Sequence, residues 1–375
     1  MQFSPMKQLP NIAFGLSLVL PALVLSTQGI AQDKVRLRNG TVAEGRIESE
    51  DYNALVIKTK KGKDEKVERL NWDDVVEVTY SGAVEYQQAV NQIAGGNFAA
   101  AVQKLEAVVA SASLRKELKP LAMFQLALTQ QRMGKFSEAA TAMQDLAKNF
   151  PKSRYLVPAS QAIVDCYVAL NDPATGATAI EAVSKAATDG GVDALALVVF
   201  EYFRGRLKEA QKDTVGAKVK YQAAAAARNV QNSWTAMARL GLARCEYAEG
   251  RVDQAKDAYR ALVDLDVGNE VLAGAWNGLA DIHFQDAMKA KNAEKLTEAL
   301  FMYLRGVVEF GPAPGEGTSE YERSLASASR TFQQLAELET DDARKKQNAA
   351  RARQRMEQLR KEFPSSPHLP KDAGK

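Results

Sequence analysis

The sequence predicts a mostly α-helical solenoid of stacked helical hairpins, preceded by a small β-barrel domain. Two observations support this prediction. A glycine–alanine pattern recurs as GNFAAA at residues 96–101, GKFSEA at 134–139 and GRVDQA at 250–255. Residues 33–80 instead alternate β-branched and charged residues between short polar breaks. The chain has 375 residues, which is enough for more than one domain and a sizeable buried core.

The first 31 residues have the three-part layout of a secretory signal. Lys7 and the amino terminus supply positive charge, residues 12–25 are apolar without a charge, and the small residues Gly29 and Ala31 lie where a signal peptidase reads. The apolar run of about 14 residues is shorter than the roughly 20 that span a bilayer. We therefore expect residues 1–31 to be removed after Ala31 and the protein to be periplasmic or otherwise exported. An uncleaved membrane anchor is the alternative.

Residues 33–80 predict a small β-barrel. Asn39-Gly40 between two alternating runs is a strong hairpin signal. Four or five strands in about 48 residues fit a barrel, because a lone sheet of this size would leave its edges open. The pattern VRLRNGTVAEGRI at residues 35–47 resembles SH3-like and Sm-like barrels. Ten Lys or Arg face eleven Asp or Glu in residues 33–77, so we expect no nucleic-acid partner.

The recurring glycine–alanine pattern is explained by close packing of two helices. In most units a small residue on the first helix lies twelve positions before a small residue on the second, and the sixth unit has a longer turn. These pairs are Ala89 and Ala101 in the first unit, Ala127 and Ala139 in the second, Gly205 and Ala217 in the fourth, Ala243 and Ala255 in the fifth, and Ala280 and Ala299 in the sixth. A glycine between the helices provides the positive φ that ends the first helix. A bulky residue one turn after the second small residue fills the gap toward the next unit; Leu105, Met143 and Tyr259 are examples.

These features resemble the tetratricopeptide repeat, a helix–turn–helix unit that stacks into a solenoid. The resemblance implies repeats over residues 82–312. A breaker at residues 311–317 then precedes a predicted capping helix pair at 318–366, and residues 367–375 are expected to be a disordered tail. A set of helices without superhelical stacking is the alternative.

Two of the predicted helix pairs end in Phe-Pro-x-Ser, at residues 150–153 and 363–366. Proline stops the second helix of a pair in both places. Such endings resemble those of Tol–Pal-associated periplasmic repeat proteins, which implies a role in the bacterial cell envelope.

The two cysteines are expected to remain separate thiols. Cys166 and Cys245 occupy the same position on the first helices of the third and fifth units, so a whole unit lies between them. Packed helices lie about 8–10 Å apart, whereas a disulfide needs Cα atoms within about 7 Å.

No combination of residues in the sequence supports catalysis. His283 and His368 are the only histidines, and neither has the spacing of a metal ligand pair. The sequence contains no nucleophile elbow and no phosphate-binding loop. We therefore predict a non-enzymatic protein without a metal or a cofactor.

The resemblance implies a concave groove lined by the first helix of each unit. Its groove-facing positions correspond here to Tyr86, Phe124, Gln131, Arg132, Gln161, Asp165, Tyr202, Arg206, Arg244, Tyr247, Asn277, Asp281 and Phe284. Aromatic, arginine and amide side chains are the mixture that peptide-binding surfaces use. Ordinary packing between helices is the alternative role for the aromatic members.

Together these features predict an exported scaffold or adaptor that binds a protein or peptide partner in the groove, in cell-envelope assembly or division. The alternative is a module that binds cell-wall glycan through the N-terminal barrel. Residues 341–375 carry ten Lys or Arg and five Asp or Glu, which would allow peripheral contact with a membrane. A solvated helix face is the simpler explanation of this charge.

Overall fold

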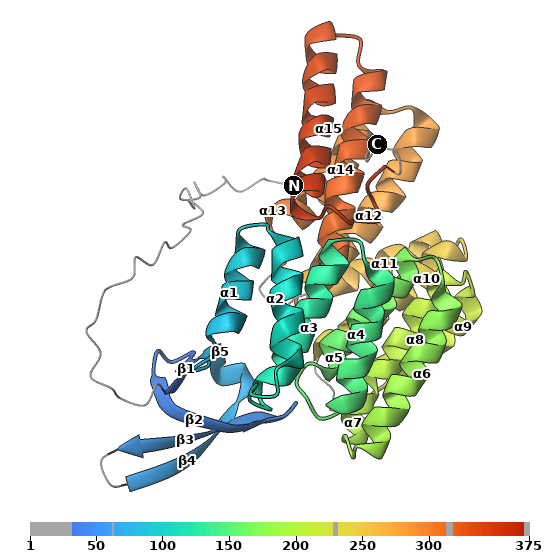
Figure 1. The fold of residues 1–375 in the computed structure, drawn as a ribbon. Helices are drawn as coiled ribbons and strands as arrows, with labels where there is room; N and C mark the ends of the chain where they lie inside the picture. Colours follow the sequence, from blue (N-terminus) through green and yellow to red (C-terminus); the bar gives the residue numbers. More distant parts are fainter. Residues whose placement is uncertain (1–31, 62–63, 228–231, 313–317, 371–375) are drawn as a thin grey trace.

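The computed structural model describes residues 32–61, 64–227, 232–312 and 318–370 (Figure 1). The predicted secretory signal lies outside these residues. Within the described part of the chain, a small sheet comes first and stacked helices follow (Figure 1). None of the described helices combines the length and the apolar character needed to cross a membrane.

The N-terminal sheet has five antiparallel strands in the order β4-β3-β2-β1-β5. Their bounds are β1 Asp33–Leu37, β2 Val42–Glu50, β3 Ala54–Lys61, β4 Asp64–Asn71 and β5 Val75–Thr79. The described edge strands β4 and β5 do not pair with each other, so the sheet is open and the predicted closed barrel is not formed.

The helical array covers the face of the sheet that a closed barrel would have buried. Val35, Ile47, Leu55 and Ile57 are fully buried and pack in one cluster with Leu118, which is 2% exposed. Leu118 begins the first helix of the second hairpin. Because this helix shields the apolar face, the sheet needs no closure to keep that face from water.

Two arginines join the sheet to the helices. Arg115 forms a bidentate pair with Asp33, at 2.7 and 2.9 Å, and Asp33 is 1% exposed. Burial opposes ionisation of Asp33, but Arg115 and nearby N–H groups outweigh it and lower the pKa of the carboxyl. The guanidinium of Arg154 lies 4.0 Å from the centre of the Trp72 ring. The sheet is therefore fixed to the helical array by charge as well as by apolar contact.

The described residues after the sheet form a series of helical hairpins, as predicted. The pairs are α1 Val84–Ala94 with α2 Phe98–Ala110, α3 Leu118–Arg132 with α4 Phe136–Asn149, α5 Leu156–Ala169 with α6 Pro173–Asp189, α8 Val199–Ala210 with α9 Thr214–Ala225, α10 Asn232–Ala248 with α11 Val252–Val263, α12 Asn269–Ala290 with α13 Ala293–Val308, and α14 Ser319–Leu338 with α15 Asp342–Glu362. A short helix, α7 Ala194–Leu197, lies between α6 and α8. The predicted α-solenoid is thus confirmed, and α14 and α15 stand at its end (Figure 1).

The small-residue pairs that predict the hairpins lie at their closest approaches. Their alanines are all fully buried: Ala89, Ala101, Ala127, Ala139, Ala217, Ala243, Ala255, Ala280 and Ala299. Left-handed backbone ends the first helix in six hairpins, at Gly96, Gly134, Asn171, Lys212, Gly250 and Lys291. Glycine therefore occupies this position in three units, and other residues adopt the same conformation in the other three.

The fully buried Tyr221 and the nearly buried Tyr259 fill the gaps between neighbouring hairpins. A Cβ atom on Gly205 or on Gly241 would lie 2.6 Å from the ring of Tyr221. A Cβ atom on Gly278 would lie 2.3 Å from the ring of Tyr259. Each ring therefore packs directly on the backbone of the next first helix.

We expect Gly278→Ala to destabilise the protein by about 2 kcal/mol, because the added methyl group displaces the Tyr259 ring from a packed site. The measurement is the thermal unfolding midpoint. Gly95→Ala is the matched control, since its Cβ would meet nothing closer than 3.5 Å. Equal midpoints for the two variants would contradict this account of the packing.

Cys166 and Cys245 are buried free thiols on α5 and α10, as predicted. Burial raises the pKa of Cys166 to about 12 and that of Cys245 to about 11. Neither thiol has the lowered pKa of a reactive cysteine.

Candidate functional site

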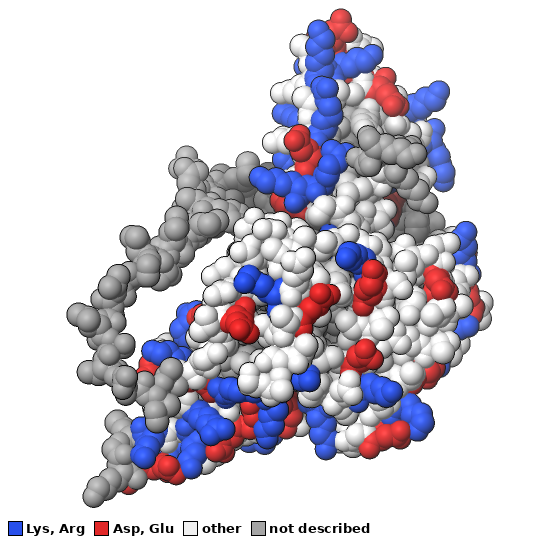
Figure 2. Space-filling view, in the orientation of Figure 1, with Lys and Arg blue, Asp and Glu red and all other residues white. Residues whose placement is uncertain are grey.

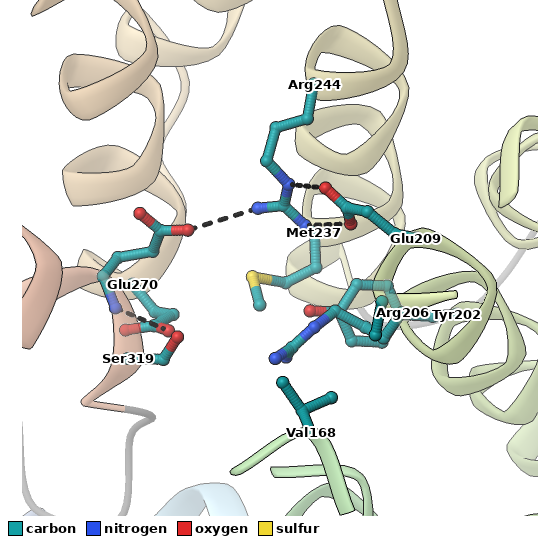
Figure 3. Close-up of a pocket in the computed structure, with 10 residues that line it drawn as sticks. Val168, Tyr202, Arg206, Glu209, Met237, Arg244, Glu270 and Ser319 are labelled. Atoms are coloured by element: carbon teal, nitrogen blue, oxygen red, sulfur yellow. Dashed lines mark hydrogen bonds and ion pairs between the residues drawn. The ribbon is translucent and has the colours of Figure 1, made fainter. Parts of the chain in front are cut away.

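The first helices of the later hairpins line a cavity of about 210 Å³ that contains several charged side chains (Figure 3). Its walls come from α5, α8, α10, α12 and α14. The lining residues are Val168, Tyr202, Arg206, Glu209, Ala210, Met237, Arg244, Glu270, Ser319 and Glu320. Because they belong to five helices spread over the chain, the cavity exists only when the solenoid is assembled.

Arg206 is the basic group that points into this cavity (Figure 3). Its Nη2 lies 3.1 Å from Oδ1 of Asp165, and its side chain is 15% exposed. Tyr202, one turn earlier on α8, lies beside Arg206 and also lines the cavity (Figure 3). A guanidinium carries five N–H donors, so donors remain for a ligand in the cavity.

Arg244 is held on both sides of the cavity and has less capacity for a ligand. Its Nε and Nη2 donate to the two carboxylate oxygens of Glu209, at 2.9 and 3.2 Å. Its Nη1 donates to Oε1 of Glu320 at 3.2 Å. The hydroxyl of Tyr221 also donates to Glu209, at 2.6 Å. Arg244 therefore ties α8 to α14 across the concave face.

Glu320 is the acidic centre of this network. Its carboxylate accepts from Arg244, from Nη1 of Arg323 at 3.1 Å and from Nδ2 of Asn277 at 3.0 Å, and its side chain is 8% exposed. Burial alone would raise its pKa, but Arg323, Arg244 and Asn277 outweigh burial and lower it to about 2. Glu320 is therefore ionised at every physiological pH.

Glu270 lies beside Glu320, and its pKa is shifted in the opposite direction. Its Oε1 accepts from the backbone N–H of Glu320 at 3.2 Å, and the residue is 9% exposed. No ion pair to Glu270 is found in the described part of the chain. Burial, with the neighbouring charge of Glu320, raises its pKa to about 8. Glu270 is therefore mostly protonated near neutral pH.

Helix α14 covers the far part of the predicted groove. Asn277 is fully buried, and its amide also donates to the backbone oxygen of Glu320 at 2.9 Å. Asp281 pairs with Arg323 and accepts from the hydroxyl of Tyr303. Phe284 is 6% exposed. These three predicted groove residues face another helix of the same chain.

The remaining predicted groove residues are distributed differently. Tyr202, Arg206 and Arg244 line the cavity, and Asp165 pairs with Arg206 beside it. Tyr202 is only 1% exposed and packs on neighbouring rings.

Toward the start of the array, the ring of Phe124 stacks on that of Tyr155, with centroids 5.0 Å apart. Tyr86 packs on the small core of the first hairpin. Arg132 is exposed at the end of α3, and Gln131, Gln161 and Tyr247 are partly buried. The structure thus brings three of the predicted groove residues to one cavity, and the other predicted residues lie elsewhere along the array.

Sequence reasoning missed the acidic half of the site, which consists of Glu209, Glu270 and Glu320. Glu209 follows Arg206 by three positions on α8, and that spacing places both side chains on one helix face. Glu270 and Glu320 lie in the first turns of α12 and α14. Acidic residues are common at that place in any helix, so the sequence carried no signal that these two would meet.

The fold and the cavity define a class of protein, an α-solenoid of tetratricopeptide-like hairpins with a charged inner face. Residues 121–153 and 237–266 match the family model of the tetratricopeptide repeat. These are the second and fifth hairpins, α3 with α4 and most of α10 with α11.

Several solved structures are similar to this chain. A tetratricopeptide repeat protein from Parabacteroides merdae is 15% identical, with 72% of this chain and 99% of that chain covered and a TM-score of 0.40. The Rap protein complexed with competence and sporulation factor is 15% identical, with 76% and 78% covered and a TM-score of 0.43. PilF of Pseudomonas aeruginosa is 16% identical, with 66% and 94% covered and a TM-score of 0.36. No curated protein matches the chain.

Proposed function

We propose that this protein is an exported, non-enzymatic scaffold that binds a protein or peptide partner on the concave face of its solenoid. The observation that carries the proposal is the guanidinium of Arg206, which points into the cavity while Asp165 holds it in place. A preorganised arginine in a site that is partly shielded from solvent is a typical anchor for a partner's carbonyl or carboxylate oxygen. Stacked helical hairpins present such sites along an extended concave surface.

The cellular role in this proposal is that of an adaptor in cell-envelope assembly or division. Two features of the sequence support it: the secretory signal in residues 1–31 and the Phe-Pro-x-Ser endings of two hairpins. In this role the solenoid holds an envelope protein.

We expect Arg206→Gln to weaken retention of the partner by roughly 10- to 100-fold, because a hydrogen bond from a charged donor is worth about 1.5–3 kcal/mol. The partner is first identified by affinity capture from envelope extract with the wild-type protein and is then titrated against each variant. Arg260→Gln is the control, because Arg260 is exposed on the second helix α11 and does not line the cavity. Unchanged affinity for the Arg206 variant would refute the proposed site.

Glycan binding by the N-terminal sheet is the second candidate function. The β3–β4 hairpin projects from the body of the protein and carries Lys58, Lys60 and Lys66 (Figure 1). Loss of retention on purified sacculi when these three lysines become glutamine would favour the glycan function over the adaptor function.

Peripheral contact with a membrane would involve α15, along which basic side chains are exposed (Figure 2). Salt-sensitive retention on vesicles of anionic lipid, without retention on neutral vesicles, would support that contact.

A further inference from the structure

The segment that follows α15 returns to the start of the solenoid. The Oγ atom of Ser365 donates to the backbone oxygen of Gln131 at 3.0 Å, across 234 positions of the chain. A Cβ atom on Gly134 would lie 3.9 Å from Cβ of Ser365. The C-terminal segment thus contacts the turn of the second hairpin, α3 with α4, although it belongs to the seventh.

The same segment is fixed to α14. The ring of Phe363 packs edge-on against Tyr321, with centroids 5.9 Å apart. Ser366 is 8% exposed and lies beside the carboxylate of Glu322 on α14. Two backbone bonds fold the segment, from Ser366 N to Phe363 O at 3.0 Å and from Leu369 N to Ser366 O at 3.2 Å. The seventh hairpin therefore holds residues 363–370 in a defined conformation.

This position is next to the charged cavity. Glu322, which lies beside Ser366, has its pKa raised by burial and, to a smaller degree, by the charge of Asp165. Asp165 in turn pairs with Arg206 at the cavity. Figure 1 shows the segment passing from the base of α15 across α14. Residues 363–370 thus lie across the concave side, between the second hairpin and the helix that lines the cavity.

We propose that residues 363–370 are an internal ligand on the concave rim, and that the rim binds extended segments of the same chemistry from a partner: an aromatic residue followed by proline and serine. This proposal rests on the proposed function, because it names the class of partner that the concave face accepts. The rim formed by Gln131, Tyr321 and Glu322 is a binding site in its own right.

The chemistry of the rim fits such a segment. Gln131 offers a carbonyl oxygen in the last turn of α3, where the helix dipole is negative and favours a hydroxyl donor. Tyr321 packs on an aromatic ring, and the carboxylate of Glu322 lies beside the buried Ser366. The prolines at 364, 367 and 370 restrict the unbound segment, so little conformational entropy is lost when it binds.

A partner must displace the internal segment to bind at this rim. A short tether gives the segment an effective concentration in the millimolar range. The apparent affinity of an external peptide is reduced by the fraction of molecules whose rim is occupied. Release of the internal segment should therefore expose a site that the wild-type protein hides.

The test uses a fluorescent synthetic peptide with the sequence of residues 362–370, EFPSSPHLP, titrated against full-length variants by anisotropy. Ser366→Asp places a second carboxylate beside Glu322 at a buried position, which releases the segment. We expect this variant to bind the peptide at least 10-fold more tightly than the wild-type protein. Ser113→Asp, the same change at an exposed serine of a distant loop, is expected to bind like the wild type.

Phe363→Ala provides an independent release, because it removes the contact with Tyr321 and leaves Ser366 in place. Circular dichroism is used to check that each variant is folded. If Ser366→Asp does not fold, the comparison of Phe363→Ala with the wild-type protein tests the proposal. A gain in peptide affinity in the folded variants supports the proposal. Equal affinity of wild-type protein and Phe363→Ala overturns it. The affinity of Arg206→Gln for the captured partner is measured in a separate experiment, so the proposed function is tested independently of this proposal.

Discussion

Glu320→Gln is expected to destabilise the protein by about 3 kcal/mol or more. Arg244 and Arg323 both donate to this carboxylate, and the glutamine leaves each guanidinium with a single counter-charge, Glu209 for Arg244 and Asp281 for Arg323. A hydrogen bond to a charged group is worth about 1.5–3 kcal/mol, and two such bonds lose their anion in this variant. The loss should appear as a lower thermal unfolding midpoint at pH 7.

The pH dependence gives this prediction a second test. The pKa of Glu320 falls from 4.5 to about 2 on folding, so the stability that it contributes is complete above pH 4.5 and is lost as the pH falls toward 2. The wild-type protein should lose stability over this range more steeply than Glu320→Gln. Glu357→Gln, an exposed glutamate on α15 without an ion pair among the described residues, should follow the wild type. Parallel curves for all three proteins would show that Glu320 does not hold the network together.

The hairpins were predictable because their signal is local. Ala127 and Ala139 lie on two helices that are joined by a short connection. Gly134 in this connection has a backbone conformation that few other residues adopt. The repeat of this pattern therefore fixes the helix pairs before any long-range contact is known. Lys212 and Lys291 adopt the same conformation without being glycine, and there the sequence carries a weaker signal.

The open sheet could not be predicted from its strands. The strand pattern of residues 33–80 requires one covered face but does not say what covers it. Leu118 and Arg115, which are far along the chain, provide the cover and the anchoring charge. A barrel was the simplest closure for an isolated domain, and the helical array removed the need for it.

The basic residues of the candidate site could be predicted from the sequence, but its acidic residues could not. Arg206 and Arg244 occupy repeat positions, so the repeat register places them on the inner face. Glu270 and Glu320 meet only because the solenoid curves until α14 reaches α10 and α12. That curvature depends on the packing of all the hairpins together, and no local pattern encodes it. The contact of Ser365 with the second hairpin could not be predicted from the sequence for the same reason.

Glu270→Gln is expected to stabilise the protein in alkaline solution, by roughly 3–5 kcal/mol at pH 8.5. The pKa of Glu270 rises from 4.5 to about 8 on folding, so the folded protein holds a proton that the unfolded chain releases. Its contribution to stability is therefore complete below pH 4.5 and is lost as the pH rises through about 8. Glutamine reproduces the protonated acid at every pH, because its oxygen can accept from the N–H of Glu320 and its amide replaces the acid proton.

The two carboxyl groups thus predict opposite responses from neighbouring positions. Wild-type protein and Glu270→Gln should have the same unfolding midpoint at pH 5 and diverge steadily up to pH 8.5, whereas Glu106→Gln, an exposed change on α2, should follow the wild type throughout. If the midpoints of wild type and Glu270→Gln stay parallel, Glu270 is ionised in the folded protein and the cavity is wetter than its lining suggests. If they diverge, ionisation of Glu270 places a second negative charge beside Glu320 at mildly alkaline pH. The charge that a partner meets next to Arg206 then depends on pH, so partner affinity measured at pH 6 and pH 8.5 should differ in the wild type and not in Glu270→Gln.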